Sequence, residues 1–185
     1  MHQREMLLRA LPLRAVPLAL IIVLLSLPAM AGDLQISLAD PAWNGATIPQ
    51  GQWCKSYGGQ GSTPALSVAG IPPEADALVF KYGDRTFMKM SGGGHGVVGY
   101  HIAPGTTEIT VPPMPGQTFD LPEGFYSIRA HKGTQWGHAA GAYLPPCSGG
   151  RGNTYDVRVL AVKITEPDGK DWDELDSATL KLGRY

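Results

Sequence analysis

The 185-residue chain carries little charge of either sign, and its basic residues are not clustered. Lys and Arg number 15, Asp and Glu number 16, and the formal net charge at pH 7 is −1. Nucleic-acid-binding domains carry a basic patch that neutralises phosphates, and proteins held at anionic membranes carry a polybasic segment. The sequence therefore argues against nucleic acid as a partner and against electrostatic attachment to a membrane.

The chain also lacks an uninterrupted apolar run of the ~18–20 residues that a membrane span requires. Its most apolar segment, Ala15 to Pro28, is interrupted by prolines and follows three arginines. Ala29-Met30-Ala31 then has the small-x-small pattern of a signal-peptide cleavage site. We therefore predict a signal peptide at residues 1–31, no stable membrane anchor, and a periplasmic or secreted protein that begins after Ala31.

Cysteine is scarce, and both cysteines belong to the predicted mature domain, residues 32–185. This single domain has 12 basic and 15 acidic residues and a net charge of −3, because the signal peptide removes three arginines and one glutamate. An oxidising compartment permits a disulfide between Cys54 and Cys147, which would stabilise the fold by roughly 4–5 kcal/mol in the chain-entropy account. Two separately buried thiols are the alternative, because the sequence does not give the Cα separation.

Motifs for catalysis and for metal binding are absent as well. There is no G-x-S-x-G nucleophile elbow, and Ser91 precedes His95 without a third group to orient the histidine. His95 and His101 share one face of a predicted strand but would lie about 20 Å apart, too far to bind one ion. His131 and His138 show no metal-ligand spacing. We expect a protein that is not an enzyme and that has no metal and no cofactor.

Glycine and proline, by contrast, are abundant, with 24 and 16 residues that divide the chain into short segments. Only Gly133–Gly141 and Lys170–Ser177 suit helices, and both are short. The clearest alternation of apolar and polar residues runs through Tyr155–Ile164. This many short strands predict an antiparallel β-sandwich or barrel with one or two short helices. The predicted strands are Leu34–Leu38, Ala65–Val68, Ala77–Tyr82, Val97–Ile102, Glu108–Val111, Tyr126–Ala130, Tyr155–Ile164 and Ala178–Leu182.

The segment from Tyr143 to Tyr155 holds two prolines, a cysteine and three glycines directly before a strand. Consecutive prolines fix φ and remove two hydrogen-bond donors, so the backbone here is neither helix nor central strand. The glycines permit positive φ, which lets successive amide N–H groups face one point and bind an anion. A plain Gly/Pro loop between two strands is the alternative interpretation.

Three segments, in order, resemble the phosphatidylethanolamine-binding proteins, and most closely their bacterial Raf-kinase-inhibitor-like branch. Gly58–Pro72 is similar to the family's G-G-x-x-S-P-x-L-x-W-x-G-x-P signature, and His95–Ala103 is similar to its H-W-V-V-x-N-I-P strand. The segment from Tyr143 resembles Y-x-G-P-C-P-P-x-G-x-H-R-Y, with the spacing from Cys147 to Tyr155 preserved. The resemblance implies a β-sandwich with a small pocket for phosphate-like or phospholipid head groups, and some members of the family inhibit kinases or proteases.

The resemblance also implies which residues form the pocket. Asp84 matches the second aspartate of the family's acidic loop and His95 its first histidine. A histidine beside an aspartate can be held as a cation that faces an anionic ligand. The predicted ligand-binding residues are Asp84, His95, Pro146, Cys147, Ser148, Gly149 and Asn153.

Several family positions are occupied by different residues in this chain. Gly96 stands in place of the tryptophan and Asn153 in place of the second histidine. The acidic loop reads Tyr82-Gly83-Asp84, so its first aspartate and the proline after it are missing. Pro145, Ser148 and Gly149 also depart from the family's turn. We therefore expect a binding protein for a small anionic or phospholipid-like ligand. A protein-interaction or inhibitor module with a vestigial pocket is the alternative.

Overall fold

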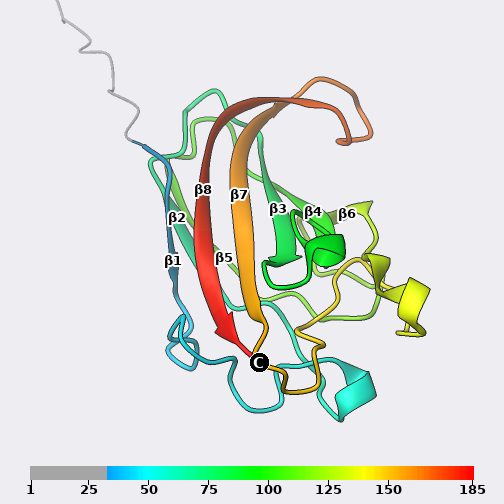
Figure 1. Cartoon of the computed structure of the whole chain (residues 1–185). Helices are drawn as coiled ribbons and strands as arrows, with labels where there is room; N and C mark the ends of the chain where they lie inside the picture. Colours follow the sequence, from blue (N-terminus) through cyan, green and yellow to red (C-terminus); the bar gives the residue numbers. More distant parts are fainter. Residues whose placement is uncertain (1–32) are drawn as a thin grey trace, which may run out of the picture.

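The computed structural model describes residues 33–185 as two antiparallel β-sheets packed face to face (Figure 1). The predicted signal peptide lies outside the described residues. The smaller sheet has the order β1-β2-β5, with strands Gln35–Leu38, Leu66–Ala69 and Glu108–Val111. The larger sheet has the order β6-β4-β3-β7-β8, with strands Phe125–Arg129, Gly96–His101, Ala77–Asp84, Thr154–Ile164 and Trp172–Arg184. The prediction of an antiparallel sandwich is confirmed.

The helices were predicted wrongly. The described residues contain no α-helix, only the 3₁₀ helices η1 (Lys55–Tyr57), η2 (Met88–Met90) and η3 (Lys132–Trp136). Gly133–Gly141 contributes part of η3, whereas Trp172–Ser177, within the second predicted helix, forms the first half of β8. That segment is strand because β7 supplies main-chain partners to most of its residues. Asp173 and Glu174 are exposed at the edge of the sheet, whereas Asp176 Oδ2 accepts from the Leu34 amide at 2.8 Å. None of the helices among residues 33–185 has the length and apolarity to cross a membrane.

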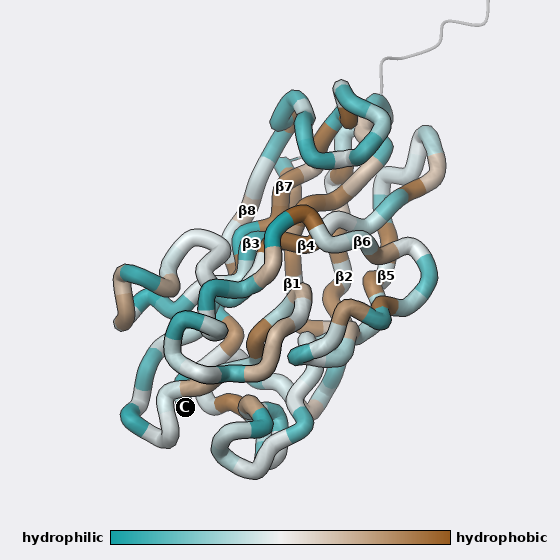
Figure 2. The backbone as a smooth tube through the Cα atoms, turned by 90° about the vertical axis from the view of Figure 1, so that its right-hand side faces the viewer, coloured by the Kyte–Doolittle hydropathy of each residue, from teal (hydrophilic) through white to brown (hydrophobic). Residues whose placement is uncertain are grey.

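The main hydrophobic core lies between the two sheets. In β3, Leu78, Phe80 and Tyr82 point into this core, while Ala77 and Val79 point to the other face of the larger sheet. That outer face carries a smaller apolar cluster with Val97, Leu160 and Val162, covered in part by Trp172. Because β3 is buried on both faces, it begins as a continuous apolar run from Ala77 to Phe80, and Figure 2 shows brown segments at the centre of the molecule. β7 alternates apolar and polar residues up to Arg158 and is apolar and buried from Val159 to Val162.

The register of the larger sheet brings three chain segments to one end of the molecule. Tyr82 of β3 pairs with Gly96 at the start of β4, and Asp84 at the end of β3 pairs with Tyr155 near the start of β7. In antiparallel strands the end of one strand lies beside the start of the next. Asp84, His95 and Tyr155 therefore meet at this end of the sheet, although up to 71 residues separate them.

Candidate ligand-binding site

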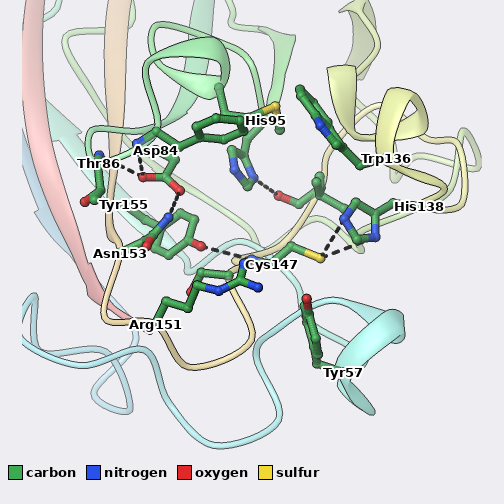
Figure 3. A pocket seen from close by; sticks show the side chains of 14 residues that line it. Tyr57, Asp84, Thr86, His95, Trp136, His138, Cys147, Arg151, Asn153 and Tyr155 are labelled. Carbon is green, nitrogen blue, oxygen red and sulfur yellow. Dashed lines mark hydrogen bonds between the residues drawn. The ribbon is translucent and has the colours of Figure 1, made fainter.

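A cavity of about 550 Å³ opens at this end of the larger sheet (Figure 3). We call Asp84, His95 and Tyr155 its sheet wall, because the ends of β3, β4 and β7 hold them. We call the segments around Tyr57, Trp136–His138 and Cys147–Asn153 its loop wall. The lining residues are Tyr57, Asp84, Thr86, Phe87, Met90, His95, Trp136, His138, Leu144, Cys147, Ser148, Arg151, Asn153 and Tyr155.

His95 is buried, with 3% of its surface exposed, and its backbone forms hydrogen bonds with one segment on each side. Its amide donates to Tyr82 O at 3.1 Å, and its carbonyl accepts from the Leu144 amide at 2.9 Å. The ring Nδ1 lies 2.7 Å from Leu144 O, so Nδ1 carries the proton and donates it to that carbonyl. Nε2 is then a bare acceptor in the cavity wall.

The interpretation of His95 as a cation is wrong. Burial lowers the pKa of His95 from 6.5 to about 4, even though the Leu144 carbonyl and the charge of Asp84 act to raise it. Desolvation wins because the ring has almost no contact with water. At neutral pH the sheet wall therefore presents a neutral imidazole beside a carboxylate.

Asp84 is also buried, and each of its carboxylate oxygens has a partner. Oδ1 accepts from the amides of Thr86 at 2.8 Å and Phe87 at 3.0 Å, which shapes the turn after β3. Oδ2 accepts from Asn153 Nδ2 at 2.6 Å. The residue that replaces the expected second histidine thus ties the loop wall to the sheet wall.

Tyr155 completes the sheet wall. Its ring meets the His95 ring edge to face at 5.3 Å, and its hydroxyl accepts from the Cys147 amide at 3.1 Å. Burial is the main cause that raises the pKa of Tyr155 to about 12, so the hydroxyl stays protonated and can still donate. The Ser148 hydroxyl donates a hydrogen bond to Tyr185 O at 2.6 Å.

Gly96, which follows His95, allows the close approach of a neighbouring backbone segment. Its φ is +123°, and a Cβ at this position would lie 2.1 Å from Ala142 O. The segment that leads to Leu144 therefore crosses directly over the start of β4, and no side chain fits here. The tryptophan of the family motif is excluded at this position by the path of the neighbouring backbone.

Cys54 and Cys147 form a disulfide, with a Cα–Cα distance of 5.3 Å and a sequence separation of 93 residues. The predicted pairing is confirmed. Cys54 directly precedes η1, and Cys147 follows the two prolines, so the bond joins two segments of the loop wall to each other. His138 lies against this bond, with Nε2 3.5 Å from Cys147 Sγ and Nδ1 2.8 Å from Ser56 Oγ.

Five of the seven predicted ligand-binding residues line the cavity: Asp84, His95, Cys147, Ser148 and Asn153. Pro146 does not, because it is buried and its carbonyl accepts from the Cys54 amide at 3.0 Å. Gly149 has the expected positive φ of +66°, but it is exposed and packs against the outer side of the Tyr57 ring. The turn thus meets the cavity through its side chains rather than through its glycine amides.

The apolar mouth of the cavity could not be predicted from the sequence. Of the five exposed large hydrophobic residues in the described chain, four lie at the mouth or next to it: Tyr57 (44% exposed), Phe87 (39%), Met88 (77%) and Trp136 (43%). Phe87 and Trp136 meet edge to face at 5.5 Å. The four residues come from three separate places: Tyr57 from η1, Phe87 and Met88 from the start of η2, and Trp136 from η3. No local pattern in the sequence therefore marks them as neighbours.

Neither a family model nor a curated protein matches the sequence. Among solved structures, YbcL of E. coli, described as a new member of the mammalian PEBP family, matches with a TM-score of 0.52 and 16% identity over 83% of this chain and 98% of YbcL. The chain has the phosphatidylethanolamine-binding protein (PEBP) fold. A putative PEBP homolog of Chlamydia trachomatis, CT736, matches with a TM-score of 0.48 and 17% identity over 83% of this chain and 97% of CT736. The match to YbcL shows the fold over 83% of this chain.

Proposed function

We propose that this PEBP-fold protein binds a small ligand with a phosphate-like group in the cavity between the sheet wall and the loop wall. The observation that carries the proposal is the charge of the lining. Arg151 is the only lining residue with a permanent positive charge, and Figure 3 shows it directed toward the cavity. A guanidinium at the mouth of a partly enclosed cavity is suited to a phosphate because its N–H groups match two phosphate oxygens.

The opposite side of the cavity favours a ligand that also donates hydrogen bonds. Asp84 is a carboxylate, and neutral His95 offers Nε2 as an acceptor. These groups suit an ammonium or hydroxyl group, whereas a bare phosphate would be repelled by the carboxylate. A zwitterionic head group such as phosphoethanolamine matches both sides, with its phosphate at Arg151 and its ammonium at the sheet wall.

The exposed aromatic side chains at the mouth support a ligand with an apolar part. Contiguous exposed apolar groups beside a polar pocket are typical of sites for amphiphilic ligands. Tyr57, Phe87 and Trp136 lie where the rest of the ligand would leave the cavity. The proposal is therefore a phospholipid-like ligand rather than a free inorganic anion.

Binding without catalysis is part of the proposal. Ser91 Oγ donates to Met88 O at 2.8 Å and is not a lining residue, so it is not positioned as a nucleophile for His95. Ser56 Oγ lies 2.8 Å from His138 Nδ1, but the other ring nitrogen faces a disulfide sulfur instead of an orienting carboxylate. We also propose export by the signal peptide at residues 1–31, and the disulfide fits an oxidising compartment.

Calorimetric titrations of the purified protein with inorganic phosphate, phosphoethanolamine and a monomeric short-chain phosphatidylethanolamine test the proposal. We expect the affinity to rise in that order, because each ligand adds a group that the cavity matches. A ligand at 100 times its dissociation constant should stabilise the fold by about 2.7 kcal/mol in a thermal melt. Absence of heat and of stabilisation with all three ligands at millimolar concentration would contradict the proposal and favour the protein-interaction module.

Two pairs of variants separate the contributions. Arg151→Ala should weaken all three ligands, whereas Arg85→Ala should not, because Arg85 pairs with Asp156 at 3.7 Å and is not a lining residue. Trp136→Ala should lower only the affinity for the short-chain phosphatidylethanolamine, to about that of phosphoethanolamine, because it removes the contact with the acyl chains. Phe119→Ala removes an aromatic ring with 57% of its surface exposed that does not line the cavity, and it should change none of the affinities.

A further inference from the structure

The loops around the cavity expose side chains that a ligand inside the cavity does not contact. We define the mouth rim as the four segments that supply loop residues to the cavity lining: 54–57, 85–91, 131–138 and 147–153. Met88, in the second of these segments, has 77% of its surface exposed and does not line the cavity. Its exposed apolar neighbours around the opening are Tyr57, Phe87 and Trp136. Exposed apolar groups gathered in this way mark a surface that contacts something other than water.

Positive charge accompanies these apolar side chains. The mouth rim contains no acidic residue and five basic residues, which are Lys55, Arg85, Lys89, Lys132 and Arg151. All five are exposed, and each is a lining residue or lies within four positions of one. Within residues 33–185, Arg85 is the only one of the five with a carboxylate partner, Asp156 at 3.7 Å. The mouth rim is therefore both basic and apolar.

This basic surface is assembled by the fold and not by one segment of sequence. Lys55 and Arg151 are 96 positions apart, so the chain has no polybasic segment. The sheet register brings the end of β3 beside the starts of β4 and β7, and the loops that join these strands meet around the cavity. Basic residues that are scattered in the sequence thus come to surround one opening.

The opposite end of the larger sheet carries the opposite charge. β7 begins beside the cavity and turns into β8 at the far end, so Figure 1 shows the β7–β8 turn at the top of the molecule and η1 near the bottom. Residues 165–174 hold one lysine and five exposed acidic residues, which are Glu166, Asp168, Asp171, Asp173 and Glu174. A negatively charged surface would therefore attract the mouth rim and repel the β7–β8 turn, although the predicted mature domain is acidic overall.

We propose that the mouth rim docks on the surface of an anionic lipid bilayer, with the cavity open toward the lipid head groups. Lys and Arg side chains are attracted by the negative potential of such a surface. Tyr and Trp side chains suit the head-group layer, where an apolar ring and a polar edge are both accommodated. Met88 and Phe87 would reach the boundary of the acyl chains. Docking itself does not depend on what the cavity holds, whereas transfer of a phospholipid between bilayer and cavity rests on the proposed function.

The arrangement of the mouth rim favours a bilayer over an acidic protein. Tyr57, Met88 and Trp136 come from three separate 3₁₀ helices and stand around an opening. A folded partner would need a surface shaped to that opening, whereas fluid lipids fill the space around separate side chains. We expect weak and reversible attachment, because a few inserted side chains bury far less apolar surface than a membrane span.

Sedimentation with lipid vesicles tests docking. Protein recovered after export is used, because the apolar run of an uncleaved signal peptide would bind lipid by itself. Vesicles of phosphatidylglycerol with phosphatidylcholine should bind the protein at low ionic strength and release it as salt is added. Phosphatidylcholine vesicles should not bind it, with or without phosphatidylethanolamine, because these lipids carry no net charge. Equal binding to uncharged vesicles with phosphatidylethanolamine would assign the attachment to the cavity and overturn docking by the mouth rim.

Two pairs of lysine substitutions with the same change of net charge locate the surface. Lys89→Gln with Lys132→Gln should weaken binding to anionic vesicles by about 25-fold, because each basic residue near the surface contributes about fivefold. Lys163→Gln with Lys170→Gln, at the end with the β7–β8 turn, should leave it unchanged. None of the four lysines lines the cavity, so titrations with monomeric phosphoethanolamine should be the same for both variants. Equal losses of vesicle binding in the two pairs would overturn the proposal.

Tryptophan fluorescence gives the orientation. Lipids with brominated acyl chains should quench the bound protein, and Trp136→Phe should remove quenching that Trp172→Phe, at the start of β8, retains. Equal quenching in the two variants would contradict insertion of the mouth rim. Absence of binding to anionic vesicles at low ionic strength, with phosphoethanolamine still bound, would overturn docking and leave the proposed function standing. Vesicle binding without any binding of monomeric ligands would do the reverse.

Discussion

The two walls of the cavity are built in different ways. The sheet wall is made of side chains at the ends of paired strands, and Asp84, His95 and Tyr155 are all buried and hydrogen bonded. The loop wall consists of segments without strand pairing, and its aromatic side chains Tyr57 and Trp136 are exposed. Its segments around Tyr57 and Cys147–Asn153 are joined to each other by the disulfide, and Asn153 is joined to the sheet wall by its hydrogen bond to Asp84.

Because the two walls are built differently, they are suited to recognise different parts of a ligand. Hydrogen-bonded buried polar groups rigidify their surroundings, so Asp84, His95 and Tyr155 are held in fixed positions on the sheet wall. Exposed side chains on irregular backbone move more readily and adapt to ligands of different shape. The sheet wall is therefore suited to polar selectivity, and the loop wall to the variable apolar part of a ligand. Three changes to the protein test this contrast.

Removal of the disulfide should have the largest effect. In the double variant Cys54→Ala with Cys147→Ala, the free energy of unfolding should fall by about 4–5 kcal/mol, because the bond closes a long loop in the unfolded chain. Denaturant unfolding measures the loss. Hydrogen exchange should show faster opening of the amides at 54–59 and 147–153, while the amides of β3 and β7 keep their relative protection. Earlier opening of β3 and β7 would reverse the contrast between the walls.

Gly96→Ala should have the next largest effect, because it disrupts the close backbone contact next to His95 of the sheet wall. Its Cβ would meet Ala142 O at 2.1 Å, and the positive φ adds strain, so we expect a loss of about 3 kcal/mol or more. Gly92→Ala is the matched control, since Gly92 has a φ of +55° but no atom within 4 Å of the added Cβ. Gly92→Ala should lower the free energy of unfolding by only about 1 kcal/mol, the cost of placing a residue with a Cβ in the left-handed region. Equal losses in the two variants would mean that backbone strain, and not the contact with Ala142 O, accounts for the destabilisation by Gly96→Ala.

The smallest expected effect is a pH dependence that arises from the sheet wall. The unfolded chain protonates His95 near pH 6.5, but the folded pKa is about 4, so the unfolded state binds more protons between these values. The contribution of neutral His95 to the free energy of unfolding is therefore fully present above pH 6.5 and is lost as the pH falls toward 4. At pH 5 the loss should be about 2 kcal/mol.

His95→Asn should remove that loss, because an amide donates to Leu144 O without titrating. Denaturant unfolding of both proteins at pH 8 and pH 5 gives the comparison. Other groups, among them His131 and His138, whose pKa values burial also lowers, contribute equally to both proteins and cancel. Identical pH dependence in the two proteins would show that His95 is not held neutral by burial.

Most of the fold could be predicted from the sequence, because strand signals are local. Alternation and turn residues placed seven of the eight strands to within two residues at each end. The eighth, β8, was predicted only in its second half, since the acidic segment at 170–177 suits a helix until β7 is present to pair with it. Pairing partners are not visible in a single segment of sequence.

The site could be predicted only where a motif carried it. Asp84, His95, Cys147, Ser148 and Asn153 were placed by resemblance and all line one cavity. The aromatic mouth, the contact of His138 with the disulfide and the neutral state of His95 were not visible. Each depends on groups that are distant in the sequence and meet only in the folded chain.

By itself, the sequence determined the short antiparallel strands, the rigid proline turn before β7 and the availability of two cysteines for one bond. These follow from side-chain periodicity and from the fixed φ of proline, which act over a few residues. Only the tertiary structure decided that the lining is acceptor-rich on one side and apolar at the mouth. Burial and proximity set the protonation of His95 and the neighbours of His138, and both arise when the sheets pack.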